Sequence, residues 1–95
     1  MAREDPSALL AALRHPERRA ILRHLSKSGK PVSPSELSRL FEEPLSNLGY
    51  HVRVLVACDA LILHHIEQVR GAIKHFYVIN PAVDSTGWVR ESLGL

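Results

Sequence analysis

The segment "SPSELSRLFEEPLSNLGYHVRVLV", residues 33–56, contains two short helical patterns separated by a turn. Ser33 and Glu36 have the spacing of a capping box, and Pro34 suits the first helical position, where its missing N–H is not needed. Residues 42–44 leave room for only a brief turn before the second pattern begins. The segment therefore predicts two helices joined by a tight turn.

The second of these helices divides into an apolar and a polar part. Its apolar residues keep the 3.6-residue period of a helix that packs on a core: Leu45, Leu48, Val52, Leu55 and Val56. Its first turns carry polar or small residues that packing alone does not require: Ser46, Asn47, Gly49, Tyr50 and Arg53. On the shorter first helix we expect Leu37, Leu40 and Phe41 to face inward. The polar front of the second helix is thus expected to face a partner.

Two further helices are predicted before this unit. Asp5 and Pro6 are typical of a helix start, and His15-Pro16 begins a new helix because the residue before a proline disfavours the helical conformation. Gly29 is a natural helix end. Both helices place apolar residues at helical spacing: Leu9, Leu10, Leu13, Ile21, Leu22 and Leu25.

After residue 60 the pattern changes to that of strands. In "LILHHIEQVRGAIKHFYVI", residues 61–79, β-branched and aromatic residues flank "QVRG", which predicts a β-hairpin. We expect Asp59 to take the left-handed conformation before it, and Asn80-Pro81 to start a final helix interrupted at Gly87. The fold class is therefore mainly α with a β-hairpin wing, a winged helix-turn-helix in one domain over residues 1–95.

Composition favours an intracellular globular protein. The chain is 45% apolar and 23% charged, which is ordinary for a folded domain. Cys58 is the single cysteine, so no intrachain disulfide is possible, and we expect it to be a packing residue rather than a reactive thiol. No apolar run approaches the roughly 18 residues of a membrane span. We expect a soluble cytoplasmic protein, associated with the nucleoid and without a membrane partner.

In its order of elements, the chain resembles the ArsR-type family of bacterial winged-helix repressors. The resemblance lies in "LAALRHPERRAILRHLSKSG", "SPSELSRLF", "LSNLGYHVRVLVACDALI" and "RGAIKHFYVI". It implies binding to double-stranded DNA through the helix that begins after Pro44, and a homodimer. The family often senses metals or other ligands, but this chain lacks a cysteine pair in that helix and a histidine in its last helix, where it has Asp84 and Glu91. We therefore expect no cofactor, and the effector is unknown.

The recognition helix carries the candidate base contacts. Asn47 can pair with two groups of adenine, and Ser46 suits a base or a phosphate. The remaining candidates are Tyr50 and His51 for thymine methyls or phosphates, Arg53 for a phosphate or guanine, and Gly49 for a close approach to DNA. Two of these have an equal alternative. His51 suits a half-buried, hydrogen-bonded position, and Gly49 suits close packing against the preceding helix.

Other candidate DNA contacts lie outside this helix. Arg70 at the hairpin tip and Lys74 on the returning strand are placed for the flanking minor groove or its phosphates. Ser35 suits a phosphate, although its alternative role in the helix cap is the stronger one. The positive residues from Arg14 to Lys30 form either an anion-attracting cluster or an ordinary solvated helix face.

The wing histidines raise the question of a metal. If Glu67 faces Ala72 across the turn, His64 and His75 lie opposite each other, near enough to share an ion. Zinc normally takes three or four protein ligands, and this stretch shows only two. We therefore favour polar pairing across the strands and expect no metal site.

These observations lead to one leading hypothesis. The chain is expected to be a sequence-specific transcriptional regulator, acting as a repressor at an inverted-repeat operator. It would dimerise through residues 1–15 and 81–95, using Leu9, Leu10, Leu13, Val83, Trp88, Val89 and Leu93. No catalytic motif is present, so we expect no enzyme activity. The alternatives are a protein-interaction module with the same fold and a metal- or ligand-sensing repressor.

Overall fold

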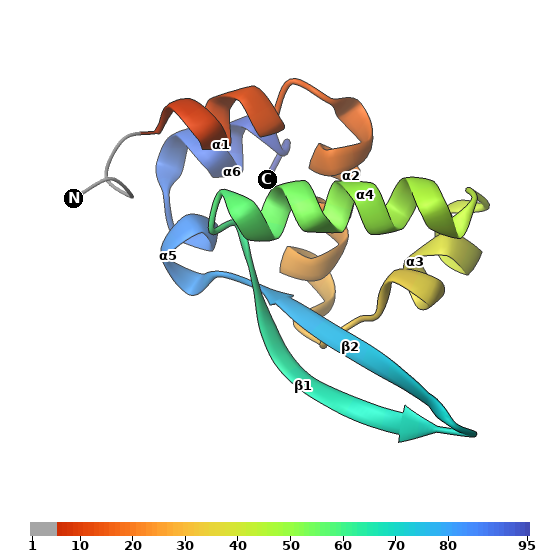
Figure 1. Cartoon of the computed structure of the whole chain (residues 1–95). Coiled ribbons are helices and arrows are strands. Elements are labelled where there is room, and N and C mark those ends of the chain that lie inside the picture. Colours follow the sequence, from red (N-terminus) through yellow and green to blue (C-terminus); the bar gives the residue numbers. More distant parts are fainter. Residues whose placement is uncertain (1–5) are drawn as a thin grey trace.

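The computed structural model describes residues 6–95 and has the predicted winged helix-turn-helix fold. Its elements are α1 (Ser7–Ala12), α2 (Pro16–Ser28), α3 (Pro34–Phe41), α4 (Leu45–Ala57), β1 (Leu61–Val69), β2 (Ala72–Ile79), α5 (Pro81–Asp84) and α6 (Gly87–Ser92). The hairpin projects from the helices, and α1 and α6 lie away from its tip (Figure 1). The final helix is thus two short helices, α5 and α6. Asp5, the expected cap of α1, lies outside the described residues.

The sequence signals around the helix-turn-helix have the expected geometry. The Ser33 hydroxyl accepts a hydrogen bond from the Glu36 backbone N–H at 3.3 Å, and the Glu36 carboxylate accepts one from the Ser33 N–H at 3.1 Å. His15 caps α2 by accepting from the Glu17 N–H, and Gly29 ends it with φ +67°. Asp59 takes the left-handed conformation with φ +64°, as predicted. These local contacts fix where the helices begin and end.

One core joins the helices to the base of the hairpin. It contains Ala12, Leu13, Ile21, Leu22, Leu25, Val32, Leu37, Leu48, Val52, Leu55, Ala60, Leu61, Ile79, Val89 and Leu93. Three residues expected to face inward are instead exposed, namely Leu40, Leu45 and Val56. On α4 the buried stripe includes His51, which moves its centre away from Leu45 and Val56. On α3, Leu37 is buried and Leu40 falls outside the inward face.

The hairpin closes more tightly than expected. Val69 pairs with Ala72 around a two-residue turn, in which Arg70 and Gly71 both have positive φ, +51° and +79°. This combination is typical of a type I′ hairpin turn. Because Arg70 adopts this conformation, residues 68 and 69 stay in the strand. The condition under which His64 and His75 would lie opposite each other, a pairing of Glu67 with Ala72, is therefore not met.

The register along the rest of the hairpin also differs from the expectation. Glu67 pairs with Lys74 and Ile66 with His75, and the register shifts at His64, between Leu63 and His65. His64 and His75 are consequently not a cross-strand pair. At its base the hairpin is joined to the loop before α3, because Val32 and Tyr77 exchange two backbone hydrogen bonds of 3.0 and 2.9 Å. The base of the wing is thus tied to the helix-turn-helix.

Candidate nucleic-acid interface

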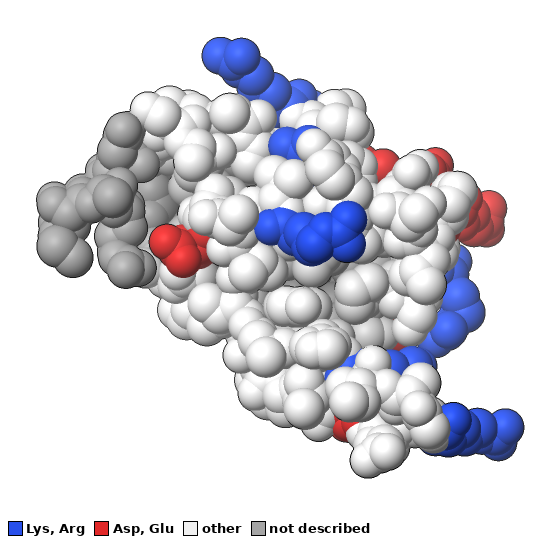
Figure 2. Space-filling view, viewed as in Figure 1, with Lys and Arg blue, Asp and Glu red and all other residues white. Residues whose placement is uncertain are grey.

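The front of α4 is held at the surface by its buried back. Leu48, Val52 and Leu55 are at most 3% exposed and anchor the helix in the core. The opposite side carries exposed Ser46, Asn47, Tyr50 and Arg53. The face along which α4 runs shows Lys or Arg atoms over the middle of that helix and at the hairpin tip, with few acidic atoms between them (Figure 2). This arrangement leaves polar groups of α4 free to meet an anionic surface.

Asn47 is oriented by the turn that precedes its helix. Its side-chain NH2 group donates a hydrogen bond of 3.3 Å to the Glu43 carboxylate. Glu43 is itself fixed by Ser38 of α3: the Glu43 N–H donates to the Ser38 carbonyl at 3.1 Å, and the Ser38 hydroxyl donates to the Glu43 carbonyl at 2.5 Å. Glu43 was not among the residues predicted from the sequence, because it lies in the turn between α3 and α4, where helical spacing gives no signal for such a contact.

His51 is not available to DNA, which corrects its assignment as a base or phosphate contact. It is 6% exposed, and its Nδ1 accepts a hydrogen bond of 3.1 Å from Arg18 Nε. Its Nε2 lies 3.2 Å from the Glu17 carboxylate, and its ring lies 4.4 Å from that of His15. The buried, hydrogen-bonded alternative is therefore the observed one.

The surroundings of His51 also fix its protonation. Desolvation by burial lowers its pKa from the usual value, and the charges of His15 and Arg18 lower it further, against a smaller opposing effect of Glu17. His51 is thus neutral near pH 7. Because Nδ1 accepts from Arg18, the proton lies on Nε2 and is donated to Glu17. The Arg18 guanidinium also lies 5.7 Å from the centre of the Tyr50 ring, within the range of a cation–π contact.

The positive residues from Arg14 to Lys30 divide into two groups: Arg14, Lys27 and Lys30 are exposed, whereas three arginines make contacts within the fold. Arg18 contacts His51, Arg19 donates to the Leu13 carbonyl at 2.6 Å, and Arg23 donates to the Leu93 carbonyl at 2.6 Å. These arginines fasten the end of α1 and the end of α6 to α2. Their positive charge therefore serves the fold, and sequence alone did not show it.

Gly49 and Ser35 are two candidate DNA contacts with different surroundings. Among the described residues, a Cβ at Gly49 would meet only Arg53, at 3.6 Å from Nη1, so close packing against α3 does not require this glycine. The Ser35 hydroxyl lies 3.1 Å from that of Ser33 and belongs to the polar cluster at the start of α3.

The wing combines charged, histidine and apolar residues. Arg70 is exposed at the tip, and Lys74 is half-buried opposite Glu67. His64 Nδ1 lies 2.8 Å from His65 Nδ1. His65 Nε2 lies 2.9 Å from the Glu67 carboxylate. Within residues 6–95, no three His, Cys, Asp or Glu side chains are grouped closely enough to hold a metal ion. The wing also exposes Leu63, Ile66 and Ile73, which are all more than half exposed.

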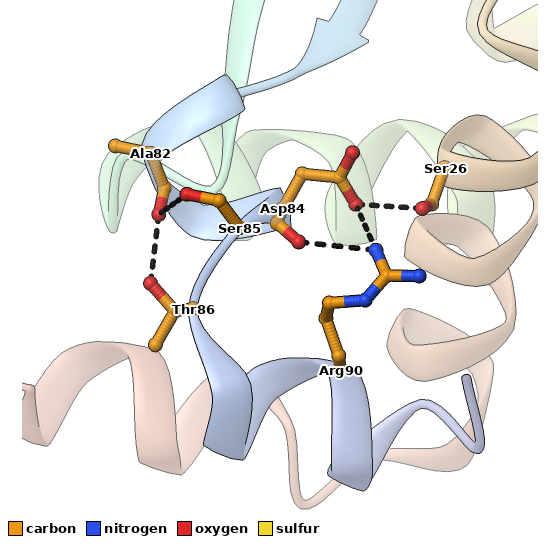
Figure 3. Close-up of polar contacts among 6 residues, drawn as sticks. All are labelled: Ser26, Ala82, Asp84, Ser85, Thr86 and Arg90. Carbon is orange, nitrogen blue, oxygen red and sulfur yellow. Dashed lines mark hydrogen bonds and ion pairs between the residues drawn. The ribbon is translucent and has the colours of Figure 1, made fainter.

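The end of the molecule formed by α1, α5 and α6 was expected to pair with a second copy. Leu13, Val89 and Leu93 are buried in the core of the single chain, so they are not free to form such a contact. Leu10 is exposed, whereas Leu9, Val83 and Trp88 pack partly against the core. The Asp84 carboxylate joins this end to α2 by accepting hydrogen bonds from Ser26 and Arg90 (Figure 3).

A shallow apolar groove lies between α1 and α4. It has a volume of about 340 Å³ and is lined by Ala8, Ala11, Ala12, Arg18, Val54, Ala57 and Cys58. Burial raises the pKa of the Cys58 thiol, which lies 3.5 Å from the Leu55 carbonyl. Cys58 is therefore a protonated packing residue at pH 7. Among the described residues, no helix is long and apolar enough to cross a bilayer.

Comparison with known proteins agrees with this architecture. A family model described as "Helix-turn-helix domain" matches residues 13–66. Among solved structures, the chain is similar to the transcriptional regulator HlyU from Vibrio vulnificus CMCP6, with a TM-score of 0.62 and 18% sequence identity over 93% of this chain and 79% of that one. No curated protein sequence gave a significant match.

Proposed function

Since the chain belongs to the helix-turn-helix domain family of the ArsR type and is a DNA-binding transcriptional regulator, we propose that it is a sequence-specific repressor acting as a homodimer on an inverted-repeat operator. It would act in the cytoplasm by binding alone, without a catalytic step. The observation that carries the proposal is the exposed polar front of α4, anchored from behind by buried Leu48, Val52 and Leu55.

The proposed contacts divide between bases and phosphates. Asn47 reads adenine in the major groove, while Ser46, Tyr50 and Arg53 contact bases or phosphates beside it. Arg70, and Lys74 further from the tip, contact the flanking backbone or minor groove. Ser35 is kept as a phosphate contact at the start of α3. His51 is left out, because its burial gives it an internal role.

Dimerisation is proposed through α1 and the C-terminal helices. Leu10 is half exposed, and partly buried Val83 and Trp88 offer further apolar area at this end. A two-fold axis there would place the two α4 helices in successive major grooves, about 34 Å apart. The operator would therefore be an inverted repeat.

Selection of bound sequences from a random duplex pool tests the proposal. We expect an enriched inverted repeat, whose affinity falls steeply as salt rises because bound cations are released from the phosphates. Binding with no sequence preference, or enrichment of a single half-site by a monomer, would contradict it.

A second candidate function is suggested by the apolar wing. Leu63, Ile66 and Ile73 are large apolar side chains that are each more than half exposed. Exposed apolar surface of this kind favours a protein partner. The same selection separates the two functions, because an interaction module would enrich no duplex sequence.

A further inference from the structure

Glu43 lies at the entrance to the recognition helix in a position set by the fold. It is the second residue after α3 and the second before α4. Its backbone N–H and carbonyl are both bonded to Ser38, so its main chain is held against the end of α3. This fixed backbone sets the point from which the Glu43 side chain leaves, just before the first turn of α4. The side chain reaches Asn47.

The chemistry of this contact determines which way the Asn47 amide points. An ionised carboxylate only accepts hydrogen bonds, whereas an amide has a donating NH2 group at one end and an accepting oxygen at the other. Asn47 must therefore turn its NH2 group toward Glu43, as the 3.3 Å distance from Nδ2 to Oε1 shows. Turning the amide over would place its oxygen against the carboxylate and replace attraction by repulsion.

This orientation matches the pattern of groups on adenine. Adenine offers N7 as an acceptor and its 6-amino group as a donor in the major groove. One Nδ2 hydrogen of Asn47 is used by Glu43, which leaves the second hydrogen for N7 and the oxygen for the amino group. Bases that require the opposite order of donor and acceptor would need the disfavoured amide orientation.

We propose that Glu43 is a specificity-determining positioning residue, which fixes the Asn47 amide so that α4 reads adenine; this inference rests on the DNA-binding function proposed above. Glu43 itself contributes a negative charge close to the phosphates. Its charge therefore weakens binding to all duplexes alike, while its hydrogen bond discriminates among bases at one position.

A matched pair of variants separates these two effects. Glu43→Gln removes the charge and can either donate to or accept from Asn47, so it no longer fixes the amide. Glu42→Gln removes the same charge one residue earlier, at an exposed residue outside the Glu43–Asn47 hydrogen bond. The affinities of both variants and of wild type are measured against an operator series with each base at the position identified by Asn47→Ala.

We expect both variants to bind duplexes that lack this adenine more tightly than wild type, because each variant has lost one negative charge. Only Glu43→Gln should also relax the preference for adenine, by roughly three- to tenfold, the range that one net hydrogen bond provides. Thermal unfolding checks that both variants fold. If Glu43→Gln does not fold, Glu43→Ala replaces it, because alanine also removes the hydrogen bond that orients Asn47.

Three outcomes would overturn the inference. If Glu43→Gln and Glu42→Gln show the same base preferences, Glu43 does not orient Asn47. If wild type prefers a base other than adenine at the Asn47 position, the amide does not read DNA in the observed orientation. If wild type selects no sequence at all, the proposed function fails as well, and this result is distinct from the other two.

Discussion

Replacing His51 with leucine tests how α4 is fixed to α2. His51 accepts from Arg18 and donates to Glu17, and its side chain is almost entirely removed from solvent. Leucine fills a similar space but leaves Arg18 and Glu17 without this partner. Leaving partly buried polar groups unsatisfied costs about 1–3 kcal/mol each, partly offset by the better burial of leucine. We expect the variant to be less stable by about 1–3 kcal/mol at pH 7.5.

The same substitution has a pH dependence whose sign follows from burial. Burial lowers the pKa of His51 in the folded protein, whereas its pKa in the unfolded chain is about 6.5. As the pH falls below 6.5, the unfolded chain therefore binds a proton before the folded chain does, which favours unfolding. The stability due to neutral His51 is therefore fully present above pH 6.5. It is lost as the pH falls from 6.5 through the folded pKa. The difference in stability between wild type and His51→Leu should shrink over this range.

Urea denaturation at pH 7.5 and pH 5.5 measures both effects. His75→Leu is the matched control, because His75 is an exposed histidine on β2. We expect the control to be close to wild type in stability at pH 7.5. Equal losses of stability by wild type and His51→Leu between the two pH values would contradict a lowered pKa of His51 in the folded protein.

The remaining predictions concern DNA binding and assembly. Asn47→Ala should relax base preference at one operator position at a cost of about 1–3 kcal/mol, and an unchanged selection profile would remove Asn47 from base reading. Arg70→Ala should weaken binding to all sequences alike and lower the salt slope by about one in a salt titration; a loss confined to one sequence would contradict a backbone contact. Wild type should sediment as a dimer at micromolar concentration and Leu10→Asp as a monomer, because the exposed Leu10 side chain is proposed to be buried by the second copy; an unchanged dimer would place the interface elsewhere.

Local signals allowed most of the fold to be predicted. The capping box at Ser33, the break at Pro16 and the left-handed Asp59 depend on residues close in sequence, and their geometry is as expected. The hairpin register was not predictable in the same way. It depends on Arg70 adopting a left-handed conformation that its residue type does not favour.

The functional surface was predicted less completely because it depends on contacts distant in sequence. Helical periodicity gave the buried stripe of α4 but not its centre, which is displaced by the burial of His51. That burial in turn requires Arg18, 33 residues earlier in the chain. Leu93 was expected at the dimer surface but is buried in the core of the single chain, where Arg23 of α2 donates a hydrogen bond to its carbonyl.

The extra residue in β1 has a consequence for the shape of the wing. A deletion within a strand normally turns every following side chain to the wrong side. Deletion of His64 would not have this effect, because His64 is the extra residue between two pairs: Leu63 with Tyr77, and His65 with Phe76. Removing His64 would leave an uninterrupted ladder with each later partner unchanged, while relieving the bend that an extra residue imposes. We therefore expect deletion of His64 to change the curvature of the wing, and with it the direction of Arg70 at the tip, without changing the pairing of the strands.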